Sequence, residues 1–137
     1  MSSTEKQLVE RLKTVPIFSS TSQKQRKNLA SLGKVLKWKA GSTPITEGSK
    51  GAAFFLILEG SAEVVKGGDR VAVVHAGQFV GELALLANTP RTASVTALDD
   101  CLVFALGRPA LAAAFKADSG MALNMLEGLA ARMAATI

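Results

Sequence analysis

The two ends of the chain carry helix-like patterns of apolar residues, and the middle carries strand-like ones. Apolar side chains recur every three to four residues over 4–14, and a capping residue followed by a similar pattern predicts a second helix over 22–32. A proline in the first turn predicts a helix over 109–115, and an alanine- and methionine-rich segment predicts a last helix over 119–136. We therefore expect helices on both sides of a central β segment.

In the central segment, the apolar runs are short and are separated by Gly, Pro and Asp. The expected strands are 35–39, 42–46, 53–58, 61–66, 70–75, 78–80, 91–97 and 101–107. The Gly67 and Gly68 pair predicts a tight hairpin turn. Eight short antiparallel strands are typical of a barrel or jelly roll, so the predicted fold is mainly β: an eight-stranded β-roll with flanking helices.

Length and composition favour one domain over residues 1–137, with N-terminal helices in 1–33, the β-roll in 34–107 and C-terminal helices in 108–137. The 137 residues are 48% hydrophobic and 20% charged, which suits a single core. No apolar run approaches the roughly 20 residues that cross a bilayer, and the N-terminus has no apolar signal core. We expect no membrane segment and a cytoplasmic location.

The positive charge is concentrated in the first part of the chain, where residues 1–50 contain ten Lys and Arg against three Asp and Glu. A basic surface attracts nucleic acid or acidic membranes. However, the basic cluster 24–27 lacks interleaved aromatic residues, and nothing after residue 110 resembles a helix-turn-helix reader. We interpret the cluster as a solvated helix face and expect no nucleic-acid partner.

The sequence gives little support for a catalytic site or a metal-binding site. Cys101 is the single cysteine, lies in an apolar run and is expected to be a buried strand residue, and His75 is the single histidine. Neither residue can form a triad or a metal cage alone, so we expect no enzyme and no metal site. Trp38, Phe54 and Phe55 lie in expected strands and are interpreted as core residues.

The segment after the sixth expected strand has the chemistry of an anion site. The guanidinium of Arg91 can neutralise one phosphate charge and contact two oxygens at once. The backbone N–H groups of Leu83 and Ala84, at the start of a short helix, would add donors, and Gly81 would let the backbone approach the ligand. The hydroxyl of Thr92 would donate one more hydrogen bond.

Glu82 lies in the same segment and repels an anion, but its carboxylate is a suitable acceptor for a ribose 2′-hydroxyl. The alternative is that Glu82 and Arg91 form a surface ion pair, a common arrangement that contributes under about 1 kcal/mol. Pro90 is expected to end the short helix before the next strand begins. The segment is therefore interpreted as a helix, a break and a strand that together bind a ligand.

The segment resembles the phosphate-binding cassette of the cyclic nucleotide-binding domain family, found in catabolite-activator-type regulators, cyclic-nucleotide-dependent kinases and cyclic-nucleotide-gated channels. The family pattern of Gly-Glu-hydrophobic-Ala, a short loop and Arg-(Ser/Thr/Ala)-Ala matches residues 81–93. Upstream, 45–48 and 53–64 are similar to the two glycine-marked turns that precede the cassette. The resemblance covers roughly residues 8–135.

The resemblance implies a regulatory sensor that binds a cyclic nucleotide, with cAMP expected over cGMP and no other cofactor. Thr92 keeps the choice of nucleotide open, because a threonine at this family position can also reach the exocyclic amine of a syn guanine. The alternative is a nucleotide-free scaffold or interaction domain on the same fold. The implied ligand-binding residues of the cassette are Val80, Gly81, Glu82, Leu83, Ala84, Arg91, Thr92 and Ala93.

The resemblance also implies that the last helix closes over the base, with Arg132 as the candidate contact. Four residues recur every four positions along that helix, and the alternative is that this stripe packs on the barrel: Met121, Met125, Leu129 and Met133. The start at Met1 suits a self-standing sensor or the N-terminal part of a longer protein with a separate effector domain. The short, alanine-rich last helix gives only weak support to a homodimer.

Overall fold

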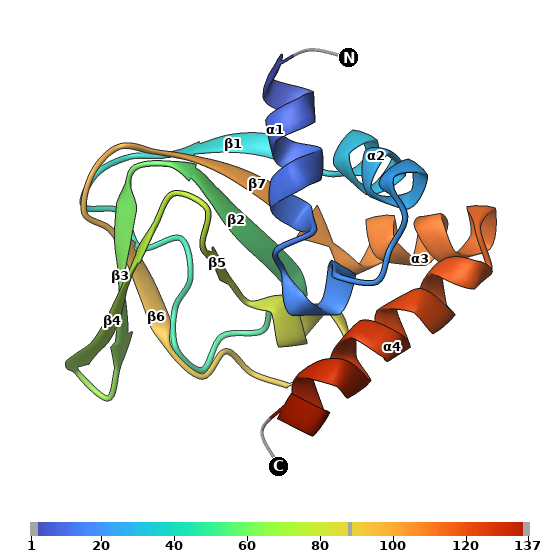
Figure 1. Cartoon of the computed structure of the whole chain (residues 1–137). Helices are drawn as coiled ribbons and strands as arrows, with labels where there is room; N and C mark the ends of the chain where they lie inside the picture. Colours follow the sequence, from blue (N-terminus) through green and yellow to red (C-terminus); the bar gives the residue numbers. More distant parts are fainter. Residues whose placement is uncertain (1–2, 88, 136–137) are drawn as a thin grey trace. The chain divides into compact units, whose positions relative to one another are not determined.

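The computed structural model describes residues 3–87 and 89–135. It divides into a helical unit, formed by Met1–Gly33 and Pro109–Ile137, and a β unit, formed by Lys34–Arg108 (Figure 1). The helical elements are α1 (Ser3–Leu12), η1 (Pro16–Phe18), α2 (Gln23–Leu32), α3 (Arg108–Ala117) and α4 (Gly120–Ala135). The expectation of one domain over 1–137 stays a prediction.

A capping box starts α2 at the position that the sequence indicates. The Ser22 hydroxyl accepts a hydrogen bond from the Gln25 N–H over 3.1 Å, and the Gln25 side chain accepts one from the Ser22 N–H over 2.9 Å. The same Gln25 amide donates to Asp118 over 3.0 Å and accepts from Asn124 over 2.9 Å. One glutamine thus joins the start of α2 to the turn after α3 and to α4.

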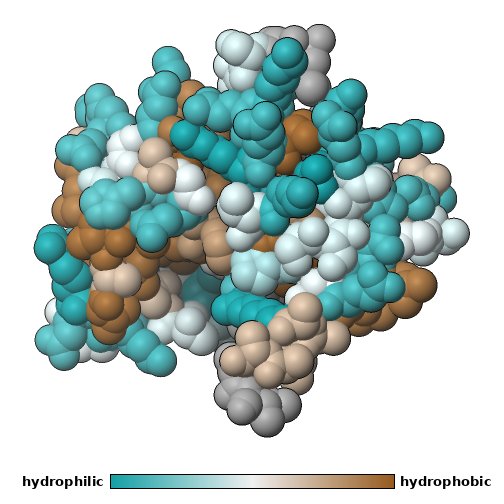
Figure 2. Space-filling model, viewed as in Figure 1, coloured by the Kyte–Doolittle hydropathy of each residue, from teal (hydrophilic) through white to brown (hydrophobic). Residues whose placement is uncertain are grey.

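The basic cluster 24–27 differs in part from its expected role as a solvated face. Lys24 and Lys27 are exposed, and the outer side of α1 and α2 is mostly hydrophilic (Figure 2). Arg26, however, is buried, and its guanidinium donates to the carbonyl oxygens of Val9 and Thr21. The sequence pattern missed this role because the two acceptors are backbone groups, which leave no mark in the residue types.

The β unit contains two antiparallel sheets and one short helix. The sheet orders are β1-β7-β2-β5 and β4-β3-β6, and η2 follows β5 along the chain. Figure 1 shows the short η2 in yellow beside the end of β5. The elements are β1 (Lys34–Trp38), β2 (Ala53–Glu59), β3 (Ser61–Lys66), β4 (Asp69–His75), β5 (Phe79–Val80), η2 (Glu82–Leu85), β6 (Ser94–Ala97) and β7 (Cys101–Gly107).

The core of the β unit draws residues from both sheets. Trp38, Ile57 and Val103 come from the four-stranded sheet, and Ala62 and Val95 from the three-stranded one. The rings of Trp38 and Phe55 meet edge to face with their centroids 5.1 Å apart. The interpretation of the strand aromatics as packing residues is therefore confirmed, and the fold class is mainly β with flanking helices.

The described residues contain seven strands, one fewer than expected. Segment 42–46 lies along β6, where Val95 N–H donates to the Ile45 carbonyl and Ala97 N–H donates to the Ser42 carbonyl, each over 2.9 Å. Only Ile45 forms a bridge, however. In a regular antiparallel ladder the Ala97 N–H would donate to Thr43, two positions before Ile45. It donates to Ser42 instead, so the register shifts by one residue and no continuous ladder forms. The strand expected from 91 likewise begins only at Ser94.

Other local expectations hold. Gly67 and Gly68 have φ angles of 59° and 86° and form the tight turn between β3 and β4. Cys101 is buried, which raises the pKa of its thiol. Among the described residues, no helix has both the length and the apolar character needed to cross a membrane.

A close approach between α4 and η1 gives a first testable prediction. A Cβ placed on Gly128 would lie 2.6 Å from the Pro16 carbonyl oxygen, which is a backbone atom. Alanine normally favours a helix over glycine by about 1 kcal/mol. Here we expect Gly128→Ala to lower the free energy of unfolding by about 1–3 kcal/mol, because overpacking outweighs propensity. Urea titration measures the difference.

Gly120→Ala is the matched control, since its Cβ would meet only the Asp118 side chain, at 3.3 Å. It should leave the free energy of unfolding within about 0.5 kcal/mol of the wild type. A Gly128→Ala variant at least as stable as the wild type would contradict the close contact.

Candidate functional site

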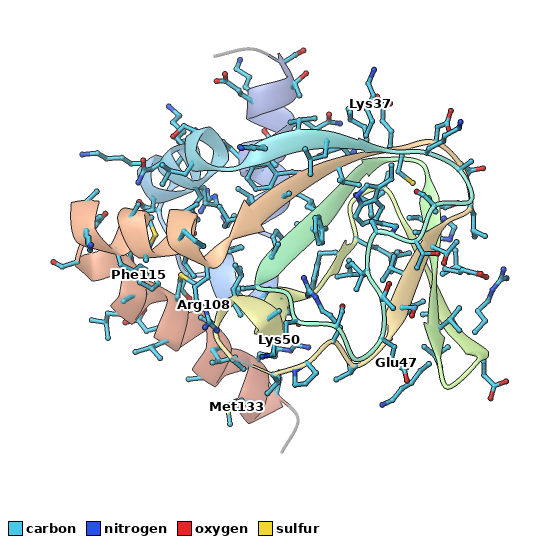
Figure 3. All side chains as sticks on the ribbon, turned by 180° about the vertical axis from the view of Figure 1, so that it is seen from behind. Lys37, Glu47, Lys50, Arg108, Phe115 and Met133 are labelled. Atoms are coloured by element: carbon cyan, nitrogen blue, oxygen red, sulfur yellow. The ribbon has the colours of Figure 1, made fainter. Side chains whose placement is uncertain are left out.

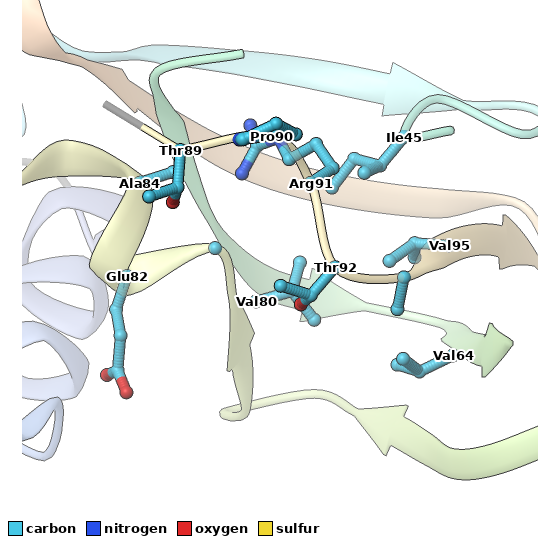
Figure 4. A pocket seen from close by; sticks show the side chains of 12 residues that line it. Ile45, Val64, Val80, Glu82, Ala84, Thr89, Pro90, Arg91, Thr92 and Val95 are labelled. Carbon is cyan, nitrogen blue, oxygen red and sulfur yellow. The ribbon is translucent and has the colours of Figure 1, made fainter. Parts of the chain in front are cut away.

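A cavity of about 310 Å³ opens in the β unit where β5, η2 and the chain before β6 meet (Figure 4). This volume is at the lower end of the range for small-ligand sites, about 300–1,000 Å³. The lining residues are Ile45, Val64, Val80, Gly81, Glu82, Ala84, Thr89, Pro90, Arg91, Thr92, Ala93 and Val95. The structure thus brings together most of the residues that the sequence assigns to the ligand.

Arg91 supplies the positive charge of this cavity and is fixed at both its backbone and its side chain. Its N–H donates to the Ser49 carbonyl over 2.9 Å, and its carbonyl accepts from the Gly48 N–H over 2.8 Å. The guanidinium donates to the Ala53 carbonyl over 2.7 Å. Partial burial lowers the pKa of Arg91 from its usual value, although an arginine remains protonated at neutral pH.

Two glycines make room for the guanidinium. A Cβ on Gly51 would lie 2.8 Å from Nε of Arg91, and a Cβ on Gly81 would lie 2.6 Å from its Nη1. Gly81 also has a φ of 77°, in the left-handed region that favours glycine. Together with the Ala53 carbonyl, the two glycines define where the charge of Arg91 lies.

The helix η2 differs from the expectation at one donor. The N–H of Ala84 donates to the Gly81 carbonyl over 3.1 Å, so this group is engaged within the turn. The expectation that the Ala84 N–H serves a phosphate therefore does not fit this structure.

Glu82 is buried, with 7% of its surface exposed, and it lines the cavity. Figure 4 shows its carboxylate directed away from the guanidinium of Arg91. Because a buried carboxylate needs hydrogen-bond donors, this position does not suit the alternative of a solvent-exposed pair with Arg91. The two opposite charges instead mark two different parts of the cavity.

The rest of the cavity wall is largely apolar. Val80 comes from β5, Val64 from β3 and Val95 from β6. Thr92 is exposed at the rim, and Ala93 lies next to it. The cavity therefore combines one guanidinium, one carboxylate and an apolar surface, which suits an amphipathic anion that carries hydroxyl groups.

Several sequence-assigned features lie outside the described residues or are not among the residues that line the cavity. The side chain of Leu83 and all of Asn88 fall outside the described residues, and the expected helix end at 136 does too. Arg132 is exposed on α4, in the helical unit. Of the stripe on that helix, Met121 and Met125 are buried, whereas Met133 is 62% exposed.

We call the groups that surround and hold Arg91 the arginine seat. Sequence reasoning missed three of them: Gly51, the Ala53 carbonyl and Ser49. Gly51 stands two residues before β2, and a glycine beside a strand can signal a close backbone approach. That signal exists in the sequence but does not name Arg91 as the group that approaches. The carbonyl acceptors leave no sequence signal, because every residue type has one.

Comparison with known proteins agrees with this geometry. Residues 35–118 match the model of the cyclic nucleotide-binding domain. The chain belongs to this family. Its match to the cAMP-dependent protein kinase regulatory subunit of Aspergillus niger is 41% identical over 99 residues, 71% of this chain and 24% of the relative. This cyclic nucleotide-binding domain thus spans about a quarter of the length of that relative.

Two solved structures show the same fold. The N-terminal domain of a Streptomyces coelicolor transcriptional regulator has a TM-score of 0.86 and 27% identity, covering 92% of this chain and 94% of that one. The regulatory domain of Toxoplasma gondii PKA, crystallised with cAMP, has a TM-score of 0.76 and 31% identity, covering 82% and 45%. The fold of this family member therefore recurs in both transcriptional and kinase regulators.

The arginine seat predicts different effects for its two glycines. In Gly51→Ala, the new Cβ meets only the movable end of Arg91, so we expect the free energy of unfolding to change by less than about 1 kcal/mol. The NMR signal of the Arg91 Nε–H should shift as the guanidinium is displaced. In Gly81→Ala, the left-handed backbone alone costs about 1–2 kcal/mol, and the Ala53 carbonyl lies 2.9 Å from the new Cβ.

Gly81→Ala should therefore be clearly less stable than Gly51→Ala in urea titration. An Arg91 Nε–H signal that stays unchanged in Gly51→Ala would show that the guanidinium does not lie against Gly51.

Proposed function

We propose that the cavity binds a 3′,5′-cyclic nucleotide, cAMP in preference to cGMP, and that the domain acts as a regulatory sensor. The observation that carries the proposal is the seat of Arg91: a cation held by backbone groups at the edge of an apolar cavity. The Toxoplasma gondii relative that was crystallised with cAMP supports the choice of ligand.

Arg91 would bind the cyclic phosphate, which carries a single negative charge. A guanidinium has five N–H donors, and the Ala53 carbonyl occupies one of them, so the planar fork can still contact two phosphate oxygens. The partial burial of Arg91 strengthens this attraction, because the local dielectric is lower than that of water. The contact between Arg91 and the cyclic phosphate would thus supply most of the free energy of anion recognition.

Glu82 would accept a hydrogen bond from the ribose 2′-hydroxyl, while Gly81 and the backbone of Leu83 approach the phosphate. Val80, Ala84 and Ala93 would contact the sugar-phosphate ring. Thr92 lies exposed at the rim, where its hydroxyl can donate to a phosphate oxygen. These roles follow the family pattern on residues that, apart from Leu83, line the cavity.

The regulatory output would come from α4, which we propose closes over the base, with Arg132 as the contact. Binding that favours a closed state shifts the population toward it. The effector would be a domain or protein outside this sequence, since the kinase regulatory subunit of Aspergillus niger is about four times as long as the matching segment. A cytoplasmic location is part of the same proposal.

The ligand assignment predicts a ranked set of affinities. Isothermal titration should show cAMP binding more tightly than cGMP. Arg91→Ala should weaken cAMP binding by roughly 100- to 1,000-fold, because breaking a desolvated charge pair from one side costs about 3–5 kcal/mol. Glu82→Gln should weaken it by about tenfold, since a charged hydrogen bond is replaced by a neutral one.

Arg70→Ala is the matched control, because Arg70 is also an arginine of the β unit but bonds Glu63 on the neighbouring strand, over 2.7 Å. It should leave cAMP affinity within about twofold, since exposed ion pairs contribute little. Absence of heat with both nucleotides would instead favour a nucleotide-free interaction domain.

The proposed closure of α4 is best tested with point variants. Deleting residues from 128 onward would remove Gly128, which packs against η1, so the helical unit itself would be damaged. Arg132→Ala changes an exposed side chain and should speed cAMP release by several-fold. In this variant, the binding of cAMP and of cGMP should still depend on Arg91. Stopped-flow release rates measure the effect. An unchanged release rate, with equal amide exchange of α4 with and without cAMP, would show that α4 is no lid.

A further inference from the structure

The strand β1 forms one edge of the four-stranded sheet, and β7 is its single sheet neighbour among the described residues. In an antiparallel edge strand, every second residue turns its N–H and carbonyl groups away from the neighbouring strand. The first four of the five residues of β1 are exposed. Figure 3 shows Lys37, the last of these four, extending away from the sheet. The outer edge of β1 is therefore open to solvent over most of its length.

The side chains of this edge read lysine, apolar, apolar, lysine from residue 34 to residue 37. Because side chains alternate between the two faces of a strand, Leu36 shares one face with Lys34, and Val35 shares the other with the second lysine. Val35 is 49% exposed and Leu36 41%, so neither apolar side chain is buried in the core. Among the described residues, neither Lys34 nor Lys37 forms an ion pair. Each face of the edge thus offers one amine beside one accessible apolar side chain.

A second cavity of the β unit, of about 490 Å³, opens where β1 ends and β7 begins. It shares no residue with the cavity that contains Arg91. Two lysines and two carboxylates lie on its wall together with apolar surface from Trp38 and Leu102, so it adds space and no net charge. The lining residues are Lys37, Trp38, Lys39, Glu59, Asp100, Cys101 and Leu102. A strand added along β1 would find room there for one uncharged side chain.

We propose that the outer edge of β1 binds an extended segment of a partner protein as an added strand, and that two acidic residues flank two apolar residues in this segment. Its acidic side chains would lie opposite Lys34 and Lys37, where cross-strand pairs of opposite charge stabilise a sheet. Its apolar side chains would lie opposite Val35 and Leu36. Main-chain hydrogen bonds to the free edge would supply the rest of the affinity. The pattern is the same in both directions, so the segment can run parallel or antiparallel to β1.

The simpler alternative is that the lysines only protect the edge, because charged side chains on an edge strand prevent edge-to-edge aggregation. The exposed Val35 and Leu36 argue against it, since apolar side chains weaken such protection. A second copy of the chain is a poor occupant, because β1 contains no acidic residue and the lysines of two copies would repel each other. A nucleic acid is also a poor occupant, because Trp38, the aromatic residue of this strand, is buried and offers no stacking surface.

The experiment titrates the whole chain with a capped peptide of the sequence Gly-Ser-Glu-Val-Ile-Glu-Ser-Gly. Two matched peptides accompany it: one has lysines in place of the glutamates, and the other is N-methylated at both the valine and the isoleucine, whose N–H groups point to opposite edges. Isothermal titration gives the affinities, and the fluorescence of Trp38, the single tryptophan of the chain, reports occupation of the neighbouring cavity. We expect the acidic peptide to bind about tenfold more tightly than either of the other two.

Lys34→Glu combined with Lys37→Glu should weaken binding of the acidic peptide by about tenfold and should favour the lysine peptide instead. Lys66→Glu is the matched control, because Lys66 is an exposed lysine at the end of β3. It should leave the affinity for the acidic peptide within about twofold of the wild type. Hydrogen exchange of residues 34–38 should slow when the acidic peptide is bound to wild type.

A peptide that binds equally well after N-methylation would show contact through charge alone and overturn the added strand. The inference is also overturned if the acidic peptide does not bind, or if a single-stranded oligonucleotide binds more tightly through the same two lysines. Sedimentation that shows self-association lost in the double variant would overturn it in favour of a second copy. If the double variant fails to fold, Lys37→Glu and the three peptides decide the matter. Binding of cAMP is measured separately, so each of these outcomes leaves the proposed function of the Arg91 cavity standing.

Discussion

The hydrogen bond from the Arg91 guanidinium to the Ala53 carbonyl fixes the one positive charge among the described residues that line the cavity beside η2. A partly buried guanidinium loses hydration, and fixed backbone acceptors must replace it. This requirement explains why Gly51 and Gly81 flank the group and why the backbone of Arg91 pairs with the loop before β2. These contacts together fix the position of the guanidinium at the cavity wall.

The short helix η2 also depends on hydrogen bonds between its backbone and a neighbouring arginine. A four-residue helix is held at its end by Arg108 and is preceded by Gly81, whose backbone conformation is left-handed. Its orientation is therefore set by its neighbours more than by its own sequence. Elements of this kind have low intrinsic stability and depend on contacts with the rest of the fold to keep their conformation.

Much of the architecture could be predicted from the sequence, because the spacing of apolar residues and the helix-capping and turn residues indicate it. Ser22 starts α2 as expected, and the Gly67 and Gly68 turn joins two strands. The strand expected over 42–46 did not form a regular ladder, because residue types do not record the one-residue shift in register that its bonds to β6 show. Most of the cassette residues line one cavity, as expected. Gly51 could not be assigned to this site from the sequence, because the residue it contacts, Arg91, lies forty positions later in the chain.

The contact between Gly128 and the Pro16 carbonyl also constrains motion. With no side chain between them, the α4 backbone and η1 lie in register, and sliding the helix by one residue would place Glu127 or Leu129 against that carbonyl. Translation of α4 along its axis relative to η1 is therefore blocked sterically at this point. The absence of a side chain at residue 128 thus fixes the register between α4 and η1 within the helical unit.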